Sequence, residues 1–174
     1  MTRPSIYNLP ARKPRMARPE QRMQIAIFNF LRPLMALPQF RDKFLAFHVG
    51  NGGGRSKAEA GIMQSMGVMA GVADIVMLFA GKDNLSGEPP YPETVFIELK
   101  AYKAPPPVRL KKDGTPVKAR VRSEKTETGL EDSQIEFRDR VTVMSFRYVL
   151  LIVKDERDAV GQIVKLMREY GVGV

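Results

Sequence analysis

The chain has 174 residues, which is enough for one domain with a buried core, and its apolar content of 44% is ordinary for a globular protein. It holds no cysteine and a single histidine, His48, which excludes disulfides, thiolate zinc centres and sites built from several histidines. The formal net charge of +9 favours a polyanionic partner, because each phosphate that Lys or Arg neutralises releases counterions. No apolar run is long enough to cross a bilayer and no signal peptide is recognisable, so we expect a soluble, intracellular protein with no membrane partner.

Residues 1–18 form a basic, proline-rich segment with few apolar side chains. Its cationic residues are Arg3, Arg12, Lys13, Arg15 and Arg18. This composition predicts a flexible arm. Contact with a nucleic-acid backbone and a purely solubilising tail both remain open for it.

Pro19 is expected to open the first helix, because proline suits the first turn. Glu20 lies in the same turn, where a carboxylate also favours the helix dipole. An apolar face at helical spacing follows, and we expect Pro33 to end the helix. Residues 44–49 are predicted to form the first strand, with a helix as the alternative.

A glycine-rich stretch, GNGGGRS at 50–56, permits unusual backbone angles. It lacks the G-x-x-x-x-G-K-[ST] spacing of a phosphate-binding loop, which argues against an NTPase. Ser56 and Glu59 then form a capping box, which predicts a helix that continues to about residue 66. The buried stripe expected for this helix consists of Ile62, Met63 and Met66.

Two strands at 74–80 and 94–100 flank a turn rich in Gly, Pro, Asn and Asp, which predicts an antiparallel hairpin. Such a hairpin brings Asp74, at the start of one strand, close to Glu98, near the end of the other. Glu98 and Lys100 are two residues apart, so their side chains share one face of the strand while Leu99 points away. A carboxylate and an ammonium at the end of a buried strand are costly unless they are used.

Asp74 and Glu98 offer the hard oxygen ligands that Mg²⁺ and Mn²⁺ prefer, and the backbone carbonyl of Leu99 is a natural further ligand. Lys100 can orient or deprotonate a water that attacks a phosphodiester. By spacing alone, an ordinary surface ion pair between Glu98 and Lys100 is the favoured explanation, because two such residues at this spacing are very common.

Residues 101–128 form a basic insertion that contains Asp113–Gly114, a two-residue hairpin signal. Its cations include Arg109, Lys111, Lys112, Lys118, Arg120 and Arg122. A two-stranded ribbon this polar has no core of its own, so we expect it to project from the body and grip DNA. A solvated, disordered loop is the alternative.

Three elements complete the chain. Ser133, or Asp132 instead, is expected to cap a helix, and residues 146–153 form a strand so apolar that we expect burial on both faces. Asp158 is expected to cap the final helix, which Gly171 ends. The predicted order is helix, strand, helix, strand, strand, helix, strand, helix.

Several motifs together closely resemble the virus-type replication-repair nuclease (VRR-NUC) domain of the PD-(D/E)XK nuclease superfamily. They are Glu20 with Gln24, HVGNGGGR at 48–55, GVMAGVAD at 67–74, FIELK at 96–100 and SQ at 133–134. The resemblance covers roughly residues 20–170 and keeps the family's order of elements.

The resemblance implies an α/β fold with a restriction-endonuclease-like core, a central mixed sheet of about four strands flanked by helices, here with a basic hairpin insertion. It also implies divalent-metal cleavage of DNA, often at branched structures. Asp74, Glu98 and Lys100 match the catalytic signature, Gln134 matches the glutamine that supports it, and Glu20 matches the first-helix acid, a further candidate metal ligand. Ala73 stands where the signature has proline, and the long turn and the insertion leave the substrate preference open.

We therefore expect one domain over 19–174 behind a basic arm at 1–18, acting as a Mg²⁺-dependent endonuclease, with Mn²⁺ as a substitute. A phage-type Holliday junction resolvase fits best, acting as a homodimer with two sites in the cytoplasm of a bacterial or phage-infected cell. The expected DNA-binding residues are Arg15, Arg18, Arg55, Lys57, Lys103, Arg109, Lys111, Lys112, Lys118, Arg120 and Arg122. The alternatives are a less selective flap or nicking nuclease that acts as a monomer, and a non-catalytic DNA-binding accessory protein.

Overall fold

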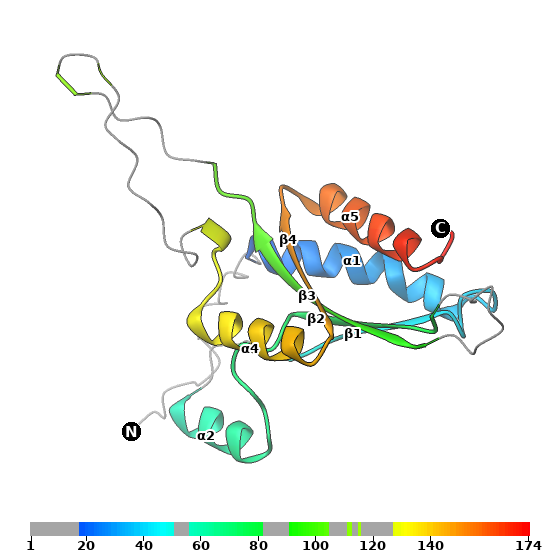
Figure 1. The fold of residues 1–174 in the computed structure, drawn as a ribbon, viewed down its shortest axis with the longest axis horizontal. Helices are drawn as coiled ribbons and strands as arrows, with labels where there is room; N and C mark the ends of the chain where they lie inside the picture. The colour runs from blue at the N-terminus through cyan, green and yellow to red at the C-terminus, as the bar shows by residue number, and fades with distance from the viewer. Residues whose placement is uncertain (1–17, 51–55, 82–90, 105–110, 113–114, 116–126) are drawn as a thin grey trace, which may run out of the picture.

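The computed structural model describes residues 18–50, 56–81, 91–104, 111–112, 115 and 127–174. Within these residues the elements follow the predicted order (Figure 1). They are α1 (Pro19–Ala36), β1 (Phe44–His48), α2 (Lys57–Ser65), β2 (Ile75–Phe79), β3 (Glu93–Ala101), α4 (Asp132–Val143), β4 (Arg147–Val153) and α5 (Glu156–Glu169). The expected α/β class is confirmed.

The four strands form one mixed sheet in the order β1-β2-β3-β4. β1 pairs with β2 and β2 with β3 in antiparallel fashion, and β3 pairs with β4 in parallel. A parallel pair needs a crossover connection, and α4 lies within the one that joins β3 to β4. Ile75 of β2 lies opposite Ile97 of β3, which places residue 74 opposite residue 98.

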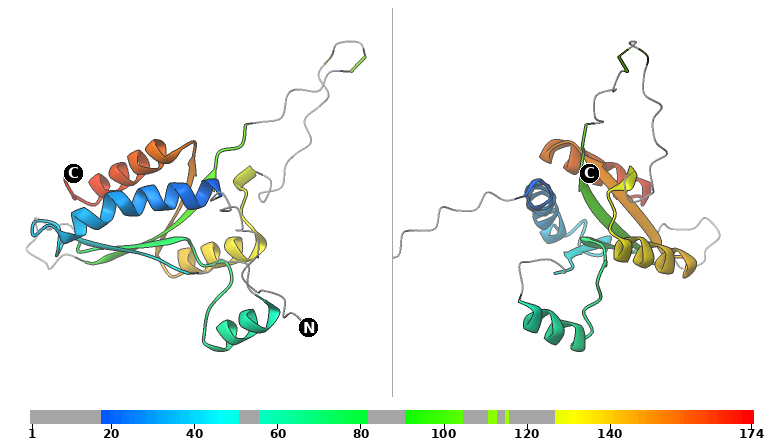
Figure 2. Two further views of the ribbon diagram at one scale, coloured as in Figure 1. Left: turned by 180° about the vertical axis from the view of Figure 1, so that it is seen from behind. Right: turned by 90° about the vertical axis from the view of Figure 1, so that its left-hand side faces the viewer.

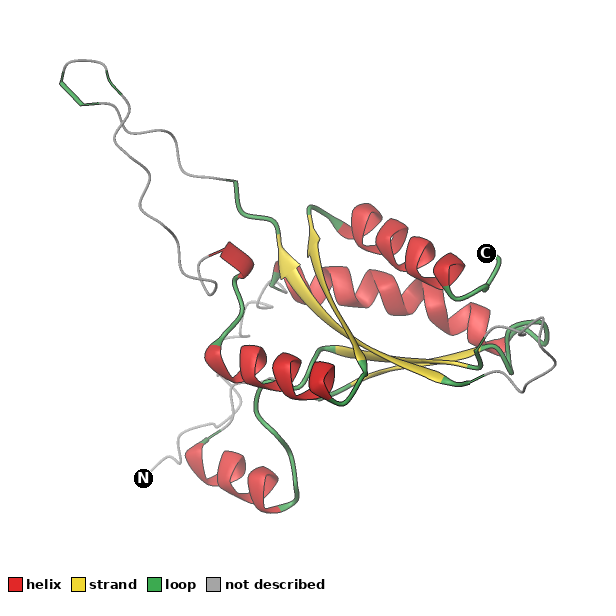
Figure 3. Cartoon of the chain, viewed as in Figure 1, coloured by secondary structure: helices red, strands yellow, loops and turns green. Residues whose placement is uncertain are grey.

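Helices cover the two faces of the sheet unequally. α1 and α5 pack against each other on one face, and α4 lies on the other (Figures 2 and 3). The main core lies between the sheet and the α1–α5 pair, with Ile27, Ile97 and Ile163 fully buried in it. A smaller cluster around Phe137 packs α4 against Phe96 of β3 and Tyr148 of β4.

Pro33 does not end α1, as the sequence had indicated; it lies inside the helix, which continues to Ala36. A proline in the last turns removes only one backbone hydrogen bond. Leu34 and Met35 beyond it pack against the main core, and this packing compensates for the lost bond.

The caps of two later helices also differ from the prediction. The N-cap residue of α4 is Glu131, rather than Asp132 or Ser133, and the Glu131 N–H donates to Gln134 Oε1 at 2.9 Å. α5 is capped by Asp155, whose carboxylate accepts from the N–H of Asp158 at 2.8 Å. The predicted capping box of α2 is confirmed, since Ser56 and Glu59 exchange hydrogen bonds.

The burial expected for two elements is wrong. In α2, Ile62 is 59% exposed and Met66 is 73% exposed, and the helix stands away from the sheet in both views of Figure 2. In β4, Ile152 is 44% exposed, because α4 and α5 do not cover the whole strand. The predictions of a helix and of a strand are correct. The predicted burial fails because no neighbouring element covers Ile62, Met66 or Ile152.

Several predictions concern residues outside the described part of the chain: the arm at 1–17, most of the glycine-rich stretch, and most of the basic insertion. Within the insertion, the N–H of Lys111 donates to the carbonyl of Thr115 at 2.8 Å. No helix among the described residues is both long enough and apolar enough to span a membrane.

Candidate functional site

The candidate site lies where β2 begins and β3 ends. Asp74 immediately precedes β2 and lies opposite Glu98 in the register of the hairpin. Leu99 is 1% exposed and belongs to the main core under α1 and α5, so its neighbours Glu98 and Lys100 point to the other face of β3, toward α4. The structure thus brings the three signature residues together.

Glu98 is the only charged residue that is buried in the described chain, at 1% exposure. Its Oε1 accepts hydrogen bonds from Lys100 Nζ at 3.0 Å and from Gln134 Nε2. Its Oε2 is buried and has no partner among the described residues. Burial, and then the charge of Asp74, raise the pKa of Glu98 to about 7, against the lowering effect of Lys100 and Gln134.

Asp74 is held in place by the backbone of β3. Its Oδ2 accepts from the N–H of Leu99 at 3.0 Å, at the position just before β2 begins. Burial raises the pKa of Asp74, and the Leu99 hydrogen bond and the charge of Lys100 oppose this shift. In an antiparallel strand a residue's N–H and C=O point to the same side, so the carbonyl of Leu99 faces the same space as Asp74.

Lys100 and Gln134 connect this pair to α4. Lys100 Nζ donates to Glu98 Oε1 at 3.0 Å and to Gln134 Oε1 at 3.1 Å. The same Gln134 oxygen accepts from the N–H of Glu131, the first residue of the helix cap. One amide therefore caps α4 and orients both ionisable groups, so that the position of the helix sets the position of the site.

Gly71 explains how the loop before β2 comes so close to α4. Its φ is +79°, and a Cβ built there would lie 2.1 Å from the carbonyl oxygen of Ser133 and 2.7 Å from the backbone nitrogen of Gln134. Only glycine fits this approach. The sequence shows Gly71 within a motif, but not the contact that requires it.

Glu20 lies close to the site without completing a metal cluster. Its Oε1 accepts from the N–H of Ala101 at 3.4 Å, and its charge contributes to raising the pKa of Asp74. Among the described residues, no group of three or more His, Cys, Asp and Glu side chains is placed to hold a metal ion. The donor set is therefore two carboxylates, a backbone carbonyl and a nearby third acid. The unpartnered buried oxygen of Glu98 fits a cation, since buried polar atoms rarely lack a partner.

His48 and Gln24 belong to the motifs that resemble the nuclease family. The structure shows what their side chains contact. His48 Nδ1 lies 2.8 Å from the carbonyl oxygen of Asp74. The side-chain amide of Gln24 contacts the same ring nitrogen, and β1 and α1 are both fastened to the backbone of Asp74 in this way.

Tyr148 is a residue that sequence reasoning missed. Its hydroxyl is buried without a partner among the described residues. Burial, followed by the charges of Glu98 and Asp74, raises its pKa, which places the hydroxyl in the field of the two carboxylates. In the sequence, Tyr148 lies within an apolar run, and nothing there indicates that its hydroxyl lies near the two carboxylates.

The predicted DNA-binding cations are only partly described. Arg18 precedes α1, Lys103 follows β3, and Lys111 and Lys112 lie in the insertion; all four are exposed. Lys57 opens α2, but its side chain is outside the described part. The residues that lie wholly outside it are Arg15, Arg55, Arg109, Lys118, Arg120 and Arg122.

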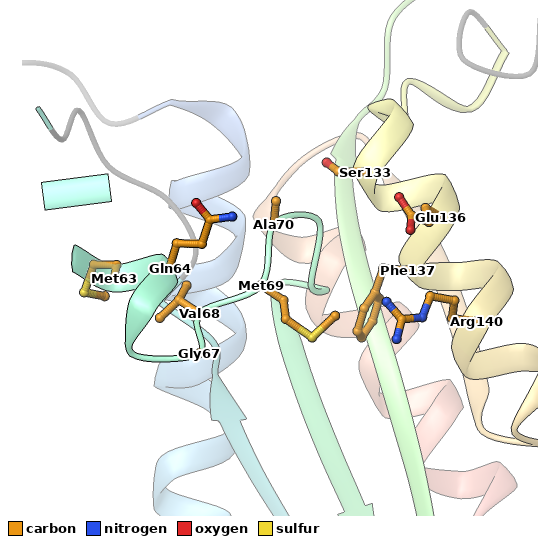
Figure 4. A pocket seen from close by; sticks show the side chains of 10 residues that line it. All are labelled: Met63, Gln64, Gly67, Val68, Met69, Ala70, Ser133, Glu136, Phe137 and Arg140. Atoms are coloured by element: carbon orange, nitrogen blue, oxygen red, sulfur yellow. The ribbon is translucent and has the colours of Figure 1, made fainter. Parts of the chain in front are cut away.

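A separate pocket of about 550 Å³ opens beside α4. Met69 and Ala70 face it from the loop before β2, and Phe137 and Arg140 face it from the helix (Figure 4). None of the carboxylates at the β2–β3 junction lines it. It is therefore distinct from the candidate site.

Comparison with protein-family models, with curated proteins and with solved structures finds no match.

Proposed function

We propose that this chain is a metal-dependent endonuclease of the VRR-NUC type, with a restriction-endonuclease-like core, that hydrolyses phosphodiester bonds in branched DNA. The observation that carries the proposal is Glu98. An ordinary surface ion pair with Lys100 would leave the carboxylate hydrated, yet Glu98 is 1% exposed and one of its oxygens has no partner among the described residues. Burying such a group is costly unless the site uses it.

The residues that would hold Mg²⁺, or Mn²⁺ in its place, are Asp74, Glu98 and the carbonyl of Leu99, with Glu20 beside them. All are hard oxygen donors, which these cations prefer. A bound cation of this kind supplies a lowered pKa for its water and stabilises negative charge on a phosphoryl group.

The chain's own residues have separable tasks. Lys100 Nζ uses two hydrogens on Glu98 and Gln134, and its third is available to orient a water or a phosphate oxygen. Gln134 fixes both partners, and the N–H of Leu99 fixes Asp74. These contacts preorganise the site before substrate binds.

The substrate is proposed from charge and architecture. A net charge of +9 favours DNA, and the exposed Lys103 lies just after the strand that carries Glu98, with the exposed Lys111 and Lys112 further along the same insertion. A four-way junction is cut symmetrically by two sites, which a two-fold homodimer provides. We therefore propose junction resolution by a homodimer.

The test is cleavage of labelled four-way junction, flap and linear duplex in Mg²⁺. We expect the junction to be cut preferentially. Asp74→Asn and Lys100→Ala should abolish cleavage and leave junction binding intact, because they remove a metal-side oxygen and the ammonium that orients the reacting groups. The matched controls are the exposed residues Asp42 and Lys165, as Asp42→Asn and Lys165→Ala. Equal cutting of linear duplex would contradict structure selectivity, and loss of binding in the two site variants would make the trio structural.

A second candidate is a non-catalytic DNA-binding accessory protein. It is favoured by the finding that the described residues include no group of three His, Cys, Asp or Glu side chains placed for a metal. Under this alternative, Asp74→Asn changes no measured activity, and calorimetric titration with Mn²⁺ shows no binding that depends on Asp74.

A further inference from the structure

A second groove, of about 440 Å³, lies along α1 next to the candidate site. Its walls include Gln24, Ile25, Phe28, Asn29 and Arg32, together with His48 at the end of β1. The α1 residues follow one another at helical spacing, so they share one side of the helix. The volume is within the range of about 300–1,000 Å³ that is typical of small-molecule sites.

The groove is linked to the backbone of the two-carboxylate site through His48. His48 is part of its wall, and His48 Nδ1 lies 2.8 Å from the carbonyl oxygen of Asp74. Gln24, also in the wall, contacts the same ring nitrogen. The side chain of His48 therefore lies between the groove and the backbone of Asp74.

The side chains that line the groove combine three properties. The amides of Gln24 and Asn29 each offer a donor and an acceptor, the pairing that base edges require. The planar guanidinium of Arg32 lies 5.9 Å from the centre of the Phe28 ring and presents donors suited to a phosphate. Ile25 is 56% exposed and supplies an apolar surface for a base or a sugar.

The charge of the groove also suits a nucleic acid. Its described lining contains an arginine and a histidine but no Asp or Glu. A polyanion can therefore enter it without meeting a like charge, and single-stranded nucleic acid is commonly held by such a combination of cation and stacking surface.

We propose that the α1 groove binds one unpaired nucleotide of the substrate strand, next to the bond that is cut. Arg32 receives its phosphate, and Asn29 with Gln24 contacts the edge of its base. This inference rests on the proposed nuclease function and adds to it the source of structure selectivity, because a base in a duplex has its pairing edge covered, whereas an unpaired base at a fork, a flap or an opened branch point exposes it.

The experiment measures binding by fluorescence anisotropy with the full chain in EDTA, where the metal-dependent reaction is stopped. The probes are a splayed duplex with unpaired thymines at the branch and a fully paired duplex of the same length. Asn29→Ala and Arg32→Gln should each weaken binding to the splayed probe by about tenfold, the scale of a lost base or phosphate contact, and binding to the paired probe by less than about twofold.

Lys165→Gln is the matched control, since Lys165 is exposed on α5 and the variant loses the same charge as Arg32→Gln. It should affect both probes alike. Asn29 is an exposed helix residue and alanine favours helix, so unchanged thermal unfolding is expected and a binding loss would not come from misfolding.

Two results would overturn the proposal: equal loss on both probes in Asn29→Ala and Arg32→Gln, or no loss on the splayed probe. A peptide ligand for the groove would give the second result. The outcomes separate from those of the nuclease proposal. If the chain cuts junctions but the groove variants bind normally, the nuclease proposal holds and the subsite proposal is wrong. If the chain cuts nothing but the groove variants lose binding to the splayed probe, the subsite proposal holds and the nuclease proposal is wrong.

Discussion

A carboxylate that folds into the core loses its hydration, and Glu98 shows the consequence. Its pKa lies at about 7 in the folded chain against 4.5 in the unfolded one. Between these two pH values the folded chain retains a proton that the unfolded chain has lost. The free energy of unfolding must therefore fall as the pH rises from about 4.5 to about 7. The site is thus a source of instability in the absence of a cation.

Glu98→Gln should remove most of this pH dependence. The neutral amide keeps the size of the side chain and has no proton to lose, so the variant in EDTA should be more stable than the parent at pH 8 by up to roughly 3 kcal/mol. It should also lose cleavage. Urea unfolding between pH 5 and pH 8 measures the effect, and a smaller slope remains because the pKa of Asp74 is raised as well.

Glu136→Gln is the control for this experiment, because Glu136 is an exposed carboxylate on α4. It should leave the slope unchanged. Identical slopes for the parent and for Glu98→Gln would show that Glu98 is ionised and compensated in the folded chain, contrary to its burial.

At the scale of elements, the contact between the loop before β2 and α4 decides the geometry of the site. Gly71→Ala should disrupt it, because alanine at a φ of +79° is strained and its Cβ would lie 2.1 Å from the carbonyl oxygen of Ser133. The backbone strain alone costs about 1–3 kcal/mol. The displaced α4 should also carry Gln134 away from Glu98 and Lys100, so cleavage should fall beyond the loss of stability.

Gly67→Ala is a close control for Gly71→Ala. Gly67 has a φ of +89°, yet a Cβ there meets nothing within 4 Å. It therefore has the backbone cost without the clash. Thermal unfolding and cleavage of the two variants, measured together, isolate the contact, and equal effects would mean that the approach to α4 is unimportant.

The sequence predicted the elements better than their packing. Periodicity and hairpin signals correctly indicated the order of elements and the opposition of Asp74 and Glu98, because these depend on local spacing. Pro33 was misread, since packing of the residues after it outweighs the lost backbone bond. The stripe of α2 was misread because burial depends on a neighbour that spacing does not reveal.

The candidate site divides in the same way. Glu98 and Lys100 share a face because strands alternate, which sequence shows directly. The contacts of Gln134 with both of them, and of His48 with the backbone of Asp74, arise from elements brought together by the fold. Tyr148 lies in an apolar strand, where only three-dimensional proximity to the carboxylates distinguishes it.

For the molecule as a whole, apolar surface is left uncovered on the side of α4. The strands β1 and β2 expose Leu45 by 52%, Phe47 by 43% and Leu78 by 37%. On α2, Ile62 and Met66 are more exposed still. Clustered apolar surface of this kind marks a site of association, and a helix of nine residues, in which no described side chain is fully buried, has little stability of its own.

The proposed homodimer therefore predicts that α2 takes part in self-association. Light scattering on the parent chain should give twice its mass of 19.6 kDa. Ile62→Glu with Met66→Glu should shift the mass to that of one chain, because a carboxylate in an apolar interface is costly. Gln64→Glu, on the opposite side of the same helix, should leave the dimer intact.

Junction cutting links this assembly to function. A dimer places two sites on one junction and cuts both strands in one encounter, so the double variant should convert paired cuts into single nicks and retain the chemistry of each site. Gel analysis of a supercoiled cruciform plasmid separates the two products, since paired cuts linearise it and single cuts only relax it. If the parent chain has the mass of one chain and leaves only nicks, the homodimer is wrong, and a monomeric nuclease with the same Asp74–Glu98–Lys100 site takes its place.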